Sequence, residues 1–263
     1  RGELRGICLD TGGATSHVAI LADALGIPSV FGLNDFSEKV NTDDVLIIDT
    51  RKSPKIIVNP KSEVISAFEE SIEKDNNNLK KSEITADGIE LHIGANVARV
   101  EEIPVLQKLG VKHIGLFRSE FVFMESLDSP SEKYQTEVYS ELVKAVSGTV
   151  VLRTLDIGSD KPLKYLPLND ENNPAMGFRS IRFSLSRPDV LEPQLRAMIK
   201  AAQYGNCRIL FPMVSIPNEL KKISELFNKI VDEIKPEKVP EWGIMLEVPS
   251  TAFMLNEIAK YTN

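Results

Sequence analysis

His17 ends a short run, TGGATSH, whose residue types suit phosphate chemistry. Gly12 and Gly13 allow the backbone to approach an anion closely, and the free N–H groups at a helix start attract negative charge. The neutral imidazole of His17 could accept a phosphoryl group there, with Thr15 or Ser16 capping the helix and orienting the ring. A helix start with an incidental surface histidine explains the same run, and the pattern by itself leaves both interpretations open.

Arginines form a second group of candidate residues. Arg118 stands in GLFRSEF, Arg153 in VLRTLDIGSDK and Arg179 in GFRSIR. A guanidinium group binds phosphate and carboxylate through paired hydrogen bonds, so converging arginines could hold a small polyanion. Each could instead be a surface charge, or the partner of a nearby acid such as Asp156 or Glu120. The surface interpretation is weaker for Arg153, because it ends an apolar strand where an unpaired charge costs free energy.

Two further positions could add to such a site. Glu247 follows the apolar run GIML and could bind a metal ion, although Mg²⁺ normally takes a second carboxylate and substrate oxygens as well. A capping or salt-bridging role is the alternative for Glu247. Lys161, in GSDK, could add positive charge beside Arg153, but an ordinary exposed turn also explains that segment.

The elements that must position these residues follow from the hydrophobic pattern. Before residue 60, we expect a helix after His17, capped by Gly26 and stopped by Pro28, and short strands at 6–9, 28–31, 45–48 and 55–58. The polar stretch 60–82 predicts a linker helix with Val64, Ile65, Phe68 and Ile72 on one stripe. An ordinary surface helix is the alternative there.

After residue 83, strands and helices alternate, which indicates a parallel sheet covered by helices. The predicted strands are 89–94, 112–116, 149–154, 207–213 and 242–247, and the predicted helices are 99–110, 131–147, 189–204, 217–234 and 250–261. Chemistry gathers at the carboxyl ends of such strands. We therefore expect Arg118, Arg153 and Glu247 at one edge of the sheet.

Composition limits the class of function. The 263 residues are 42% hydrophobic, enough for one large or two smaller cores, and 26% charged. No apolar run approaches the roughly 20 residues that span a bilayer, so no membrane insertion is expected. The net charge of −7 argues against a nucleic-acid partner. Cys8 and Cys207 lack metal-ligand spacing, and no signal peptide is visible, which favours a reducing, cytoplasmic location.

The motifs together resemble a known family. TGGATSHVAILADALGIPSVFGL is similar to the phosphohistidine segment of the phosphoenolpyruvate-utilising enzymes. GLFRSEFVFM, LRTLDIGSDK, NPAMGFRSIR, RILFPMV and GIMLEVPS follow in the order seen in enzyme I of the bacterial sugar phosphotransferase system. Ser16, where the dikinase and synthase branches usually carry cysteine, favours enzyme I, as does RTLDIGSDK. The region around LRTLDIGSDK and SLSRPDVLEPQLRAMIKAA also resembles the nitrogen-branch version of enzyme I.

The resemblance implies a fold as well as an activity. The fold is a partial phosphohistidine α/β domain over 1–59, the linker helix over 60–82, and an incomplete (β/α)8 TIM-type barrel over 83–263. Phosphoenolpyruvate would bind with Mg²⁺ at the open end of the barrel. The residues implied there are Arg118, Arg153, Arg179 and Lys161 for the substrate and Glu247 for the metal.

The resemblance further implies a phosphoenolpyruvate-protein phosphotransferase. His17 would take the phosphoryl group and pass it to a histidine of an HPr-type phosphocarrier protein, the first step of a sugar-transport system. The full-length protein would be a homodimer through the barrel.

Parts of the family pattern are missing from this sequence. In the family, the sequence continues past the position of Asn263 with a second metal ligand, a further arginine and a late cysteine. A helical insert that docks the carrier lies before the position of Arg1. We therefore expect an internal piece, truncated at both ends and inactive alone. Two other functions stay open: an ATP-using dikinase or phosphoenolpyruvate synthase, and a non-catalytic regulatory module.

Overall fold

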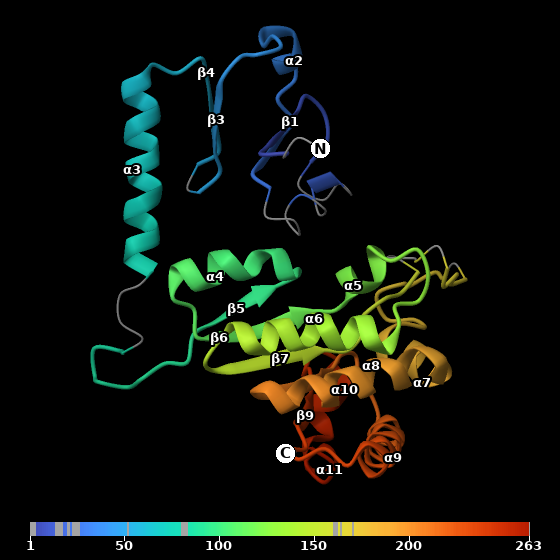
Figure 1. The fold of residues 1–263 in the computed structure, drawn as a ribbon. Coiled ribbons are helices and arrows are strands. Elements are labelled where there is room, and N and C mark those ends of the chain that lie inside the picture. The colour runs from blue at the N-terminus through green and yellow to red at the C-terminus, as the bar shows by residue number, and fades with distance from the viewer. Residues whose placement is uncertain are drawn as a thin grey trace. The chain divides into compact units, whose positions relative to one another are not determined.

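The computed structural model describes residues 4–13, 18–19, 22, 27–51, 53–79, 84–159, 163, 165–169 and 171–262. In the helix over 62–79, side chains are described only as far as residue 75. The chain forms two compact units, Arg1–Lys81 and Ser82–Asn263, which we describe separately. Figure 1 labels most of the helices and strands of both units.

Two pairs of short strands form the sheets of the first unit. Strand β1 (Ile7–Leu9) pairs in parallel with β2 (Ser29–Phe31), and β3 (Leu46–Asp49) pairs antiparallel with β4 (Lys55–Val58). Helix α2 (Phe36–Lys39) lies between β2 and β3 in the chain. All four strands lie within one residue of the predicted positions. The helix predicted after His17 is described only at Val18, Ala19 and Ala22, which are helical, and its other positions lie outside the described residues.

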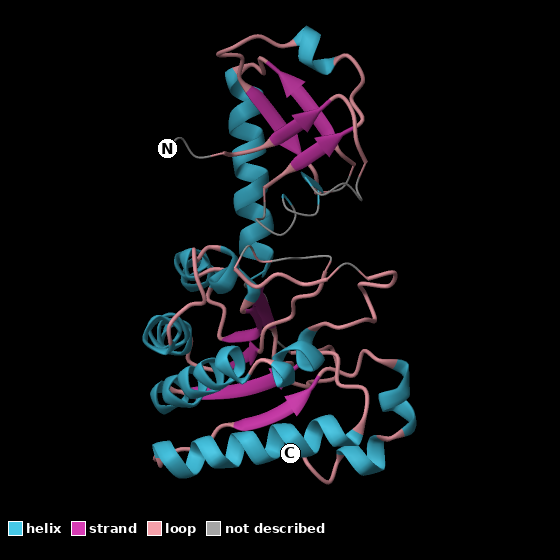
Figure 2. Cartoon of the chain, turned by 90° about the vertical axis from the view of Figure 1, so that its right-hand side faces the viewer, coloured by secondary structure: helices cyan, strands magenta, loops and turns pink. Residues whose placement is uncertain are grey.

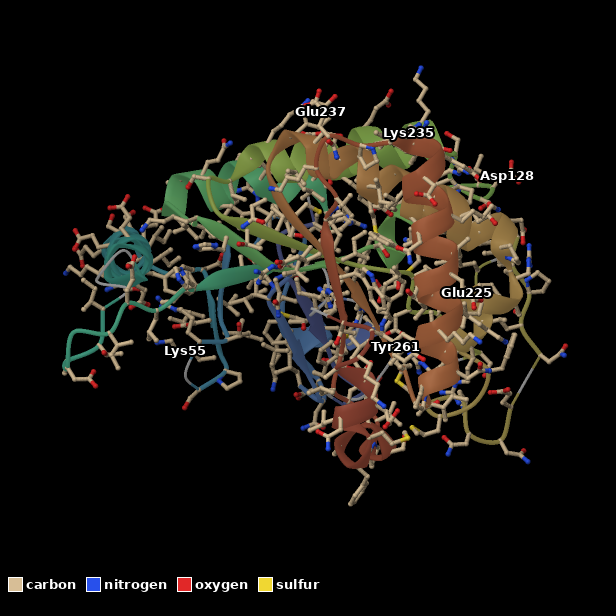
Figure 3. All side chains as sticks on the ribbon, turned by 90° about the horizontal axis from the view of Figure 1, so that it is seen from below. Lys55, Asp128, Glu225, Lys235, Glu237 and Tyr261 are labelled. Atoms are coloured by element: carbon tan, nitrogen blue, oxygen red, sulfur yellow. The ribbon has the colours of Figure 1, made fainter. Side chains whose placement is uncertain are left out.

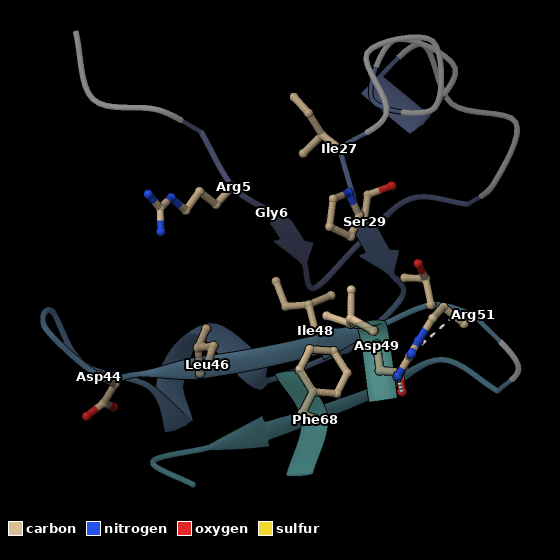
Figure 4. Close-up of a pocket in the computed structure, with 13 residues that line it drawn as sticks. Arg5, Gly6, Ile27, Ser29, Asp44, Leu46, Ile48, Asp49, Arg51 and Phe68 are labelled. Carbon is tan, nitrogen blue, oxygen red and sulfur yellow. Dashed lines mark hydrogen bonds and ion pairs between the residues drawn. The ribbon is translucent and has the colours of Figure 1, made fainter. Parts of the chain in front are cut away.

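Helix α3 (Ser62–Leu79) occupies most of the predicted linker, and the segment between β3 and β4 contacts it through one side chain. The contact depends on Arg51, whose guanidinium carbon lies 4.9 Å from the centre of the Phe68 ring. The same guanidinium group donates hydrogen bonds to Asp75 (2.7 Å) and Ser71 (3.1 Å) on α3 and to Asp49 (2.9 Å) on β3. Figure 4 shows this arginine beside a hollow of about 1000 Å³ whose walls include Ile48 and Phe68.

The second unit is built on a parallel sheet of five strands, in the sheet order β5 (Gly94–Val97), β6 (His113–Arg118), β7 (Thr149–Arg153), β8 (Asn206–Phe211) and β9 (Glu241–Ile244). Each pairing is parallel, and Figure 2 shows the strands with helices packed around them. The helices between the strands are the 3₁₀ helix η1 (Val100–Glu102), α4 (Ile103–Leu109), α5 (Glu120–Met124), α6 (Glu132–Ala145), α7 (Ser180–Ser186), α8 (Pro188–Ala201), the 3₁₀ helix η2 (Ala202–Tyr204) and α9 (Pro217–Ile234). Helices α10 (Pro249–Phe253) and α11 (Leu255–Ile258) follow β9. The predicted parallel α/β architecture is confirmed, and closure into a barrel stays a prediction.

Three details of the second unit differ from expectation. The strand predicted over 89–94 was wrong, because β5 begins only at Gly94, and Ile89, Leu91 and Ile93 are exposed. The sheet approaches Gly94 so closely that a Cβ there would lie 2.7 Å from the backbone nitrogen of Gly115. The helix predicted over 250–261 is interrupted between α10 and α11, and the short helices α5 and α7 were not predicted.

The core of the second unit lies between the sheet and its helices. Alternate residues of β7, Val150 and Leu152, are fully buried, as are Leu195 and Met198 on α8. Trp242 on β9 packs edge-on against Phe211, with 5.5 Å between ring centres.

Charged side chains lie at the periphery of the second unit. Figure 3 labels Glu225, Lys235 and Glu237 there, and all three are exposed. Within the described residues, none of the helices combines the length and the apolar character that crossing a membrane requires.

Candidate functional site

Two of the predicted arginines end neighbouring strands. Arg118 is the last residue of β6 and Arg153 the last of β7, and the two are paired in the sheet register. Both therefore lie at the carboxyl edge of the parallel sheet, where ligands of α/β proteins bind. The guanidinium carbon of Arg118 lies 5.6 Å from the centre of the Phe121 ring. Within the described part of the chain, the Nε atoms of Arg118 and Arg153 are buried and have no hydrogen-bond partner.

Arg153 is buried, with 8% of its surface exposed, and it is surrounded by compensating groups. Its Nη2 donates a short hydrogen bond to the Glu120 carboxylate, and its Nη1 lies 3.4 Å from Oδ2 of Asp156. Nη1 also lies 3.8 Å from the sulfur of Met245, in the segment after β9. A charge this deep requires such partners. One alternative from the sequence was that an arginine pairs with Asp156 or Glu120. Arg153 pairs with both.

Arg179 joins the same cluster from the segment before α7. It is also 8% exposed, and its Nη2 lies 3.0 Å from Oδ1 of Asp156. The Ser180 hydroxyl donates a short hydrogen bond to the same oxygen. Burial raises the pKa of Asp156, but the Ser180 hydroxyl and then Arg153 and Arg179 more than offset it, so the pKa lies below its usual value. Asp156 is therefore ionised at neutral pH.

Glu247 lies three residues beyond the end of β9, on the same edge of the sheet. Its side chain is exposed, and its Oε1 accepts a hydrogen bond of 2.7 Å from the backbone N–H of Met213, in the segment after β8. Met213 adopts a left-handed conformation with φ of 56°. Among the described residues, no group of three or more histidine, cysteine or acidic side chains is placed to hold a metal ion. Glu247 is therefore in no such group within the described part of the chain.

The run TGGATSH is only partly described. His17, Thr15, Ser16 and Lys161 lie outside the described residues, so their predicted roles stay predictions. Gly12 has φ of 97°, a conformation that disfavours any side chain, and a Cβ on Gly13 would meet nothing within 4 Å.

The segment that precedes this run is fixed to its own unit. The Asp10 carboxylate accepts hydrogen bonds of 3.1 and 3.2 Å from the backbone N–H of Ser37 on α2. The backbone N–H of Asn34 donates to the Asp10 carbonyl over 2.9 Å. These bonds hold the residue that lies two positions before Gly12.

A buried polar group that the sequence analysis missed links the two arginine-bearing segments. Gln194, on α8 and 1% exposed, accepts a hydrogen bond of 3.0 Å from the backbone N–H of Leu155, two residues after Arg153. Its amide donates to the Ser119 hydroxyl (3.1 Å), directly after Arg118, and to the Tyr139 hydroxyl (3.2 Å). The sequence did contain a signal for this role, because Gln194 is a polar residue on the apolar stripe of a predicted helix.

This arrangement of arginines suits a small anion with several negatively charged oxygens. Arg118, Arg153 and Arg179 come from three different segments, and Asp156 and Glu120 offset part of the charge of Arg153 and Arg179. Buried, hydrogen-bonded guanidinium groups are already desolvated and oriented, so they lose little entropy when an anion binds.

Comparison with known proteins places the chain in a family. Residues 73–263 match the model of the PEP-binding domain of the PEP-utilising enzymes, and residues 2–53 match the model of their mobile domain. The two matches divide the chain in the same order as the two compact units.

Curated relatives carry the name phosphoenolpyruvate-protein phosphotransferase. Those of Staphylococcus carnosus and Staphylococcus aureus are 37% and 36% identical to this chain over 98% of its length. The protein of Mycoplasma genitalium is 36% identical over 99% of the chain. The chain spans 47% of the length of each of these relatives. By its matches over both units, this chain belongs to the PEP-utilising enzymes.

Proposed function

We propose that this chain carries part of the machinery of a phosphoenolpyruvate-protein phosphotransferase. Phosphoenolpyruvate binds at the carboxyl edge of the second unit, its phosphoryl group moves to His17, and a histidine of an HPr-type phosphocarrier protein receives it next. The observation that supports this most is that Arg118 and Arg153 end paired strands, and that Asp156 joins Arg153 to Arg179, in a domain that matches a PEP-binding family. The names of the relatives support the identity of the acceptor as a protein.

The arginines would act on the substrate by charge and orientation. The bond between phosphorus and the enol oxygen breaks while a bond forms between phosphorus and a ring nitrogen of His17. The electron pair stays on the enolate oxygen, and protonation of the enolate carbon gives pyruvate. Negative charge is spread over the phosphoryl oxygens during transfer, so fixed guanidinium groups in a buried setting stabilise that state more than they would in water.

Glu247 fits one position in a magnesium site. Its carboxylate is exposed at the strand-end edge, and a hard cation of this kind is completed by waters and substrate oxygens rather than by protein ligands alone. When bound, Mg²⁺ would supply positive charge beside the phosphoryl oxygens. The Met213 N–H bond to Oε1 would keep the Glu247 carboxylate oriented toward the edge.

The remaining proposals concern the whole protein. We propose that residues 1–59 form part of the swivelling phosphohistidine domain, that 60–82 is the linker, and that β5–β9 with their helices belong to a (β/α)8 barrel. The protein would be a cytoplasmic homodimer through that barrel and would act in sugar uptake or in its nitrogen-branch counterpart. Strict alternation of parallel strands and helices across the second unit supports the barrel.

The test uses the product of the complete open reading frame that contains this sequence. With labelled phosphoenolpyruvate and Mg²⁺, we expect acid-labile, base-stable label on the protein, and transfer of that label to added HPr-type carrier. His17→Ala should remain unlabelled. Arg153→Lys should label far more slowly, because lysine cannot keep the paired contacts of a guanidinium group.

The matched control is Arg208→Lys, which changes an exposed arginine paired with Glu241 and should label normally. Undiminished labelling of His17→Ala would refute the assignment. Label that requires ATP would instead favour a dikinase or synthase.

A further inference from the structure

The charged cluster has Asp156 at its centre, and no part of the proposed reaction uses this residue. Its two carboxylate oxygens are divided between two arginines: Oδ2 lies 3.4 Å from Arg153 Nη1, and Oδ1 lies 3.0 Å from Arg179 Nη2. Asp156 is 7% exposed. One carboxylate therefore joins a guanidinium group at the end of β7 to another that comes from the segment before α7.

The carboxylate is itself held from a second side. Ser180 donates its hydroxyl to Oδ1 of Asp156, and its backbone N–H donates to the carbonyl of Ile157 over 2.9 Å. Ser180 has φ of 48°, in the left-handed region that a serine rarely adopts. Strained backbone of this kind persists where surrounding contacts over-determine it, and it concentrates at functional sites. These contacts fix the direction of the Asp156 carboxylate.

The position of Asp156 is unfavourable if only charge matters. A site for a polyanion loses attraction when it contains buried carboxylates, and Asp156 and Glu120 both lie among the arginines. A carboxylate in such a place is explained if it orients the arginines, because paired guanidinium groups lose less freedom when they bind an anion.

We propose that Asp156 is a positioning residue, which holds Arg153 and Arg179 side by side so that the two guanidinium groups bind phosphoenolpyruvate together. The inference rests on the proposed function, because it assigns the substrate of that function to this pair of arginines. Charge and orientation predict opposite outcomes for Asp156→Asn. Removal of a negative charge alone would tighten anion binding, whereas loss of orientation would weaken it.

The experiment measures binding of phosphoenolpyruvate with Mg²⁺ by calorimetry to the product of the complete open reading frame. We expect Asp156→Asn to raise Kd about tenfold or more, as loss of a charge-assisted hydrogen-bond network does. Ser180→Ala keeps the Asp156 charge and removes one support of its carboxylate, so it should raise Kd in the same direction by less. Asp189→Asn is the matched control, since it removes an exposed carboxylate paired with Arg187, and it should leave Kd unchanged.

Two further readouts separate positioning from a loss of folding. In the labelling reaction, Asp156→Asn should raise KM for phosphoenolpyruvate more than it lowers kcat. In ¹⁵N spectra without substrate, the guanidinium signals of Arg153 and Arg179 should show hindered rotation, and Asp156→Asn should release it. If Asp156→Asn does not fold, Ser180→Ala and these spectra decide.

Tighter or unchanged binding by Asp156→Asn or by Ser180→Ala would overturn the inference, and so would freely rotating guanidinium groups in the unsubstituted protein. If the unsubstituted protein does not bind phosphoenolpyruvate, the proposed function fails, and the guanidinium signals still decide whether Asp156 holds the two arginines.

Discussion

Replacement of Gln194 by methionine tests whether the segments that carry Arg118 and Arg153 are held by one buried amide. Methionine has nearly the length of glutamine and fills the same space, so the substitution removes the polar contacts and leaves little cavity. Three hydrogen bonds would be lost, from the Leu155 N–H and to the hydroxyls of Ser119 and Tyr139.

The expected cost follows from these three partners. A buried backbone N–H without an acceptor costs about 1–3 kcal/mol, and each lost hydroxyl contact costs about 1 kcal/mol. Tyr139 keeps its bond of 3.0 Å to Gln135, which limits the loss at that hydroxyl. We therefore expect Gln194→Met to lower the free energy of unfolding of the second unit by about 3 kcal/mol.

The assay is urea unfolding followed by tryptophan fluorescence. Trp242 is the single tryptophan of this sequence and is buried in β9, so its emission in this chain reports the second unit alone. Gln107→Met, at an exposed position of α4, is the control and should shift the free energy by less than about 0.5 kcal/mol. If Gln194→Met unfolds at the same urea concentration as the unsubstituted chain, the amide does not hold the two segments and the reasoning fails.

Three shorter predictions concern other groups. Hydrogen bonds from Arg51 hold the pKa of Asp49 at about 2 instead of 3.8. The contribution of this pair to stability should therefore be complete above pH 4 and be lost as the pH falls through about 2; carboxyl ¹³C titration should show that midpoint, and Arg51→Met should return it toward 3.8. Burial raises the pKa of the Cys207 thiol to about 12, so thiol reagents at pH 8 should modify Cys207 only after unfolding. Rapid modification of Cys207 in the folded chain, located by peptide mapping because Cys8 is only half-buried, would contradict its burial. Nδ1 of His113 accepts a hydrogen bond of 2.9 Å from the Thr149 N–H, so ¹⁵N spectra at pH 8 should show the Nε2–H tautomer; the opposite tautomer would exclude this contact.

The alternation of strands and helices in the second unit could be predicted from sequence, because its main helices are long enough to show their own period and the strands between them are apolar. Strand β5 was misplaced because IELHI at 89–93 has the composition of a strand, whereas its apolar residues Ile89, Leu91 and Ile93 are exposed. Helices α5 and α7 have only five and seven residues, too few to establish a helical period. In the first unit the four strands could be predicted from sequence, because turn residues and short apolar runs mark their positions.

The arginines could be placed at one edge of the sheet because the carboxyl ends of parallel strands meet there. What binds them to one another could not be predicted in the same way. Asp156 was named only as one possible partner of an arginine, and Gln194 lies 39 positions from Leu155 and 75 from Ser119. Contacts over such separations depend on how α7 and α8 dock, which the local pattern does not specify.

We propose that His17 receives a phosphoryl group from phosphoenolpyruvate bound by these arginines. The most direct measurement is the intact mass of the complete open reading frame product after incubation with phosphoenolpyruvate and Mg²⁺, followed by peptide mapping at neutral or alkaline pH. We expect a mass gain of one phosphoryl group, located in the peptide that contains TGGATSH and absent from His17→Ala. A phosphoryl group on any other peptide, or none on an otherwise folded protein that binds phosphoenolpyruvate, would contradict it.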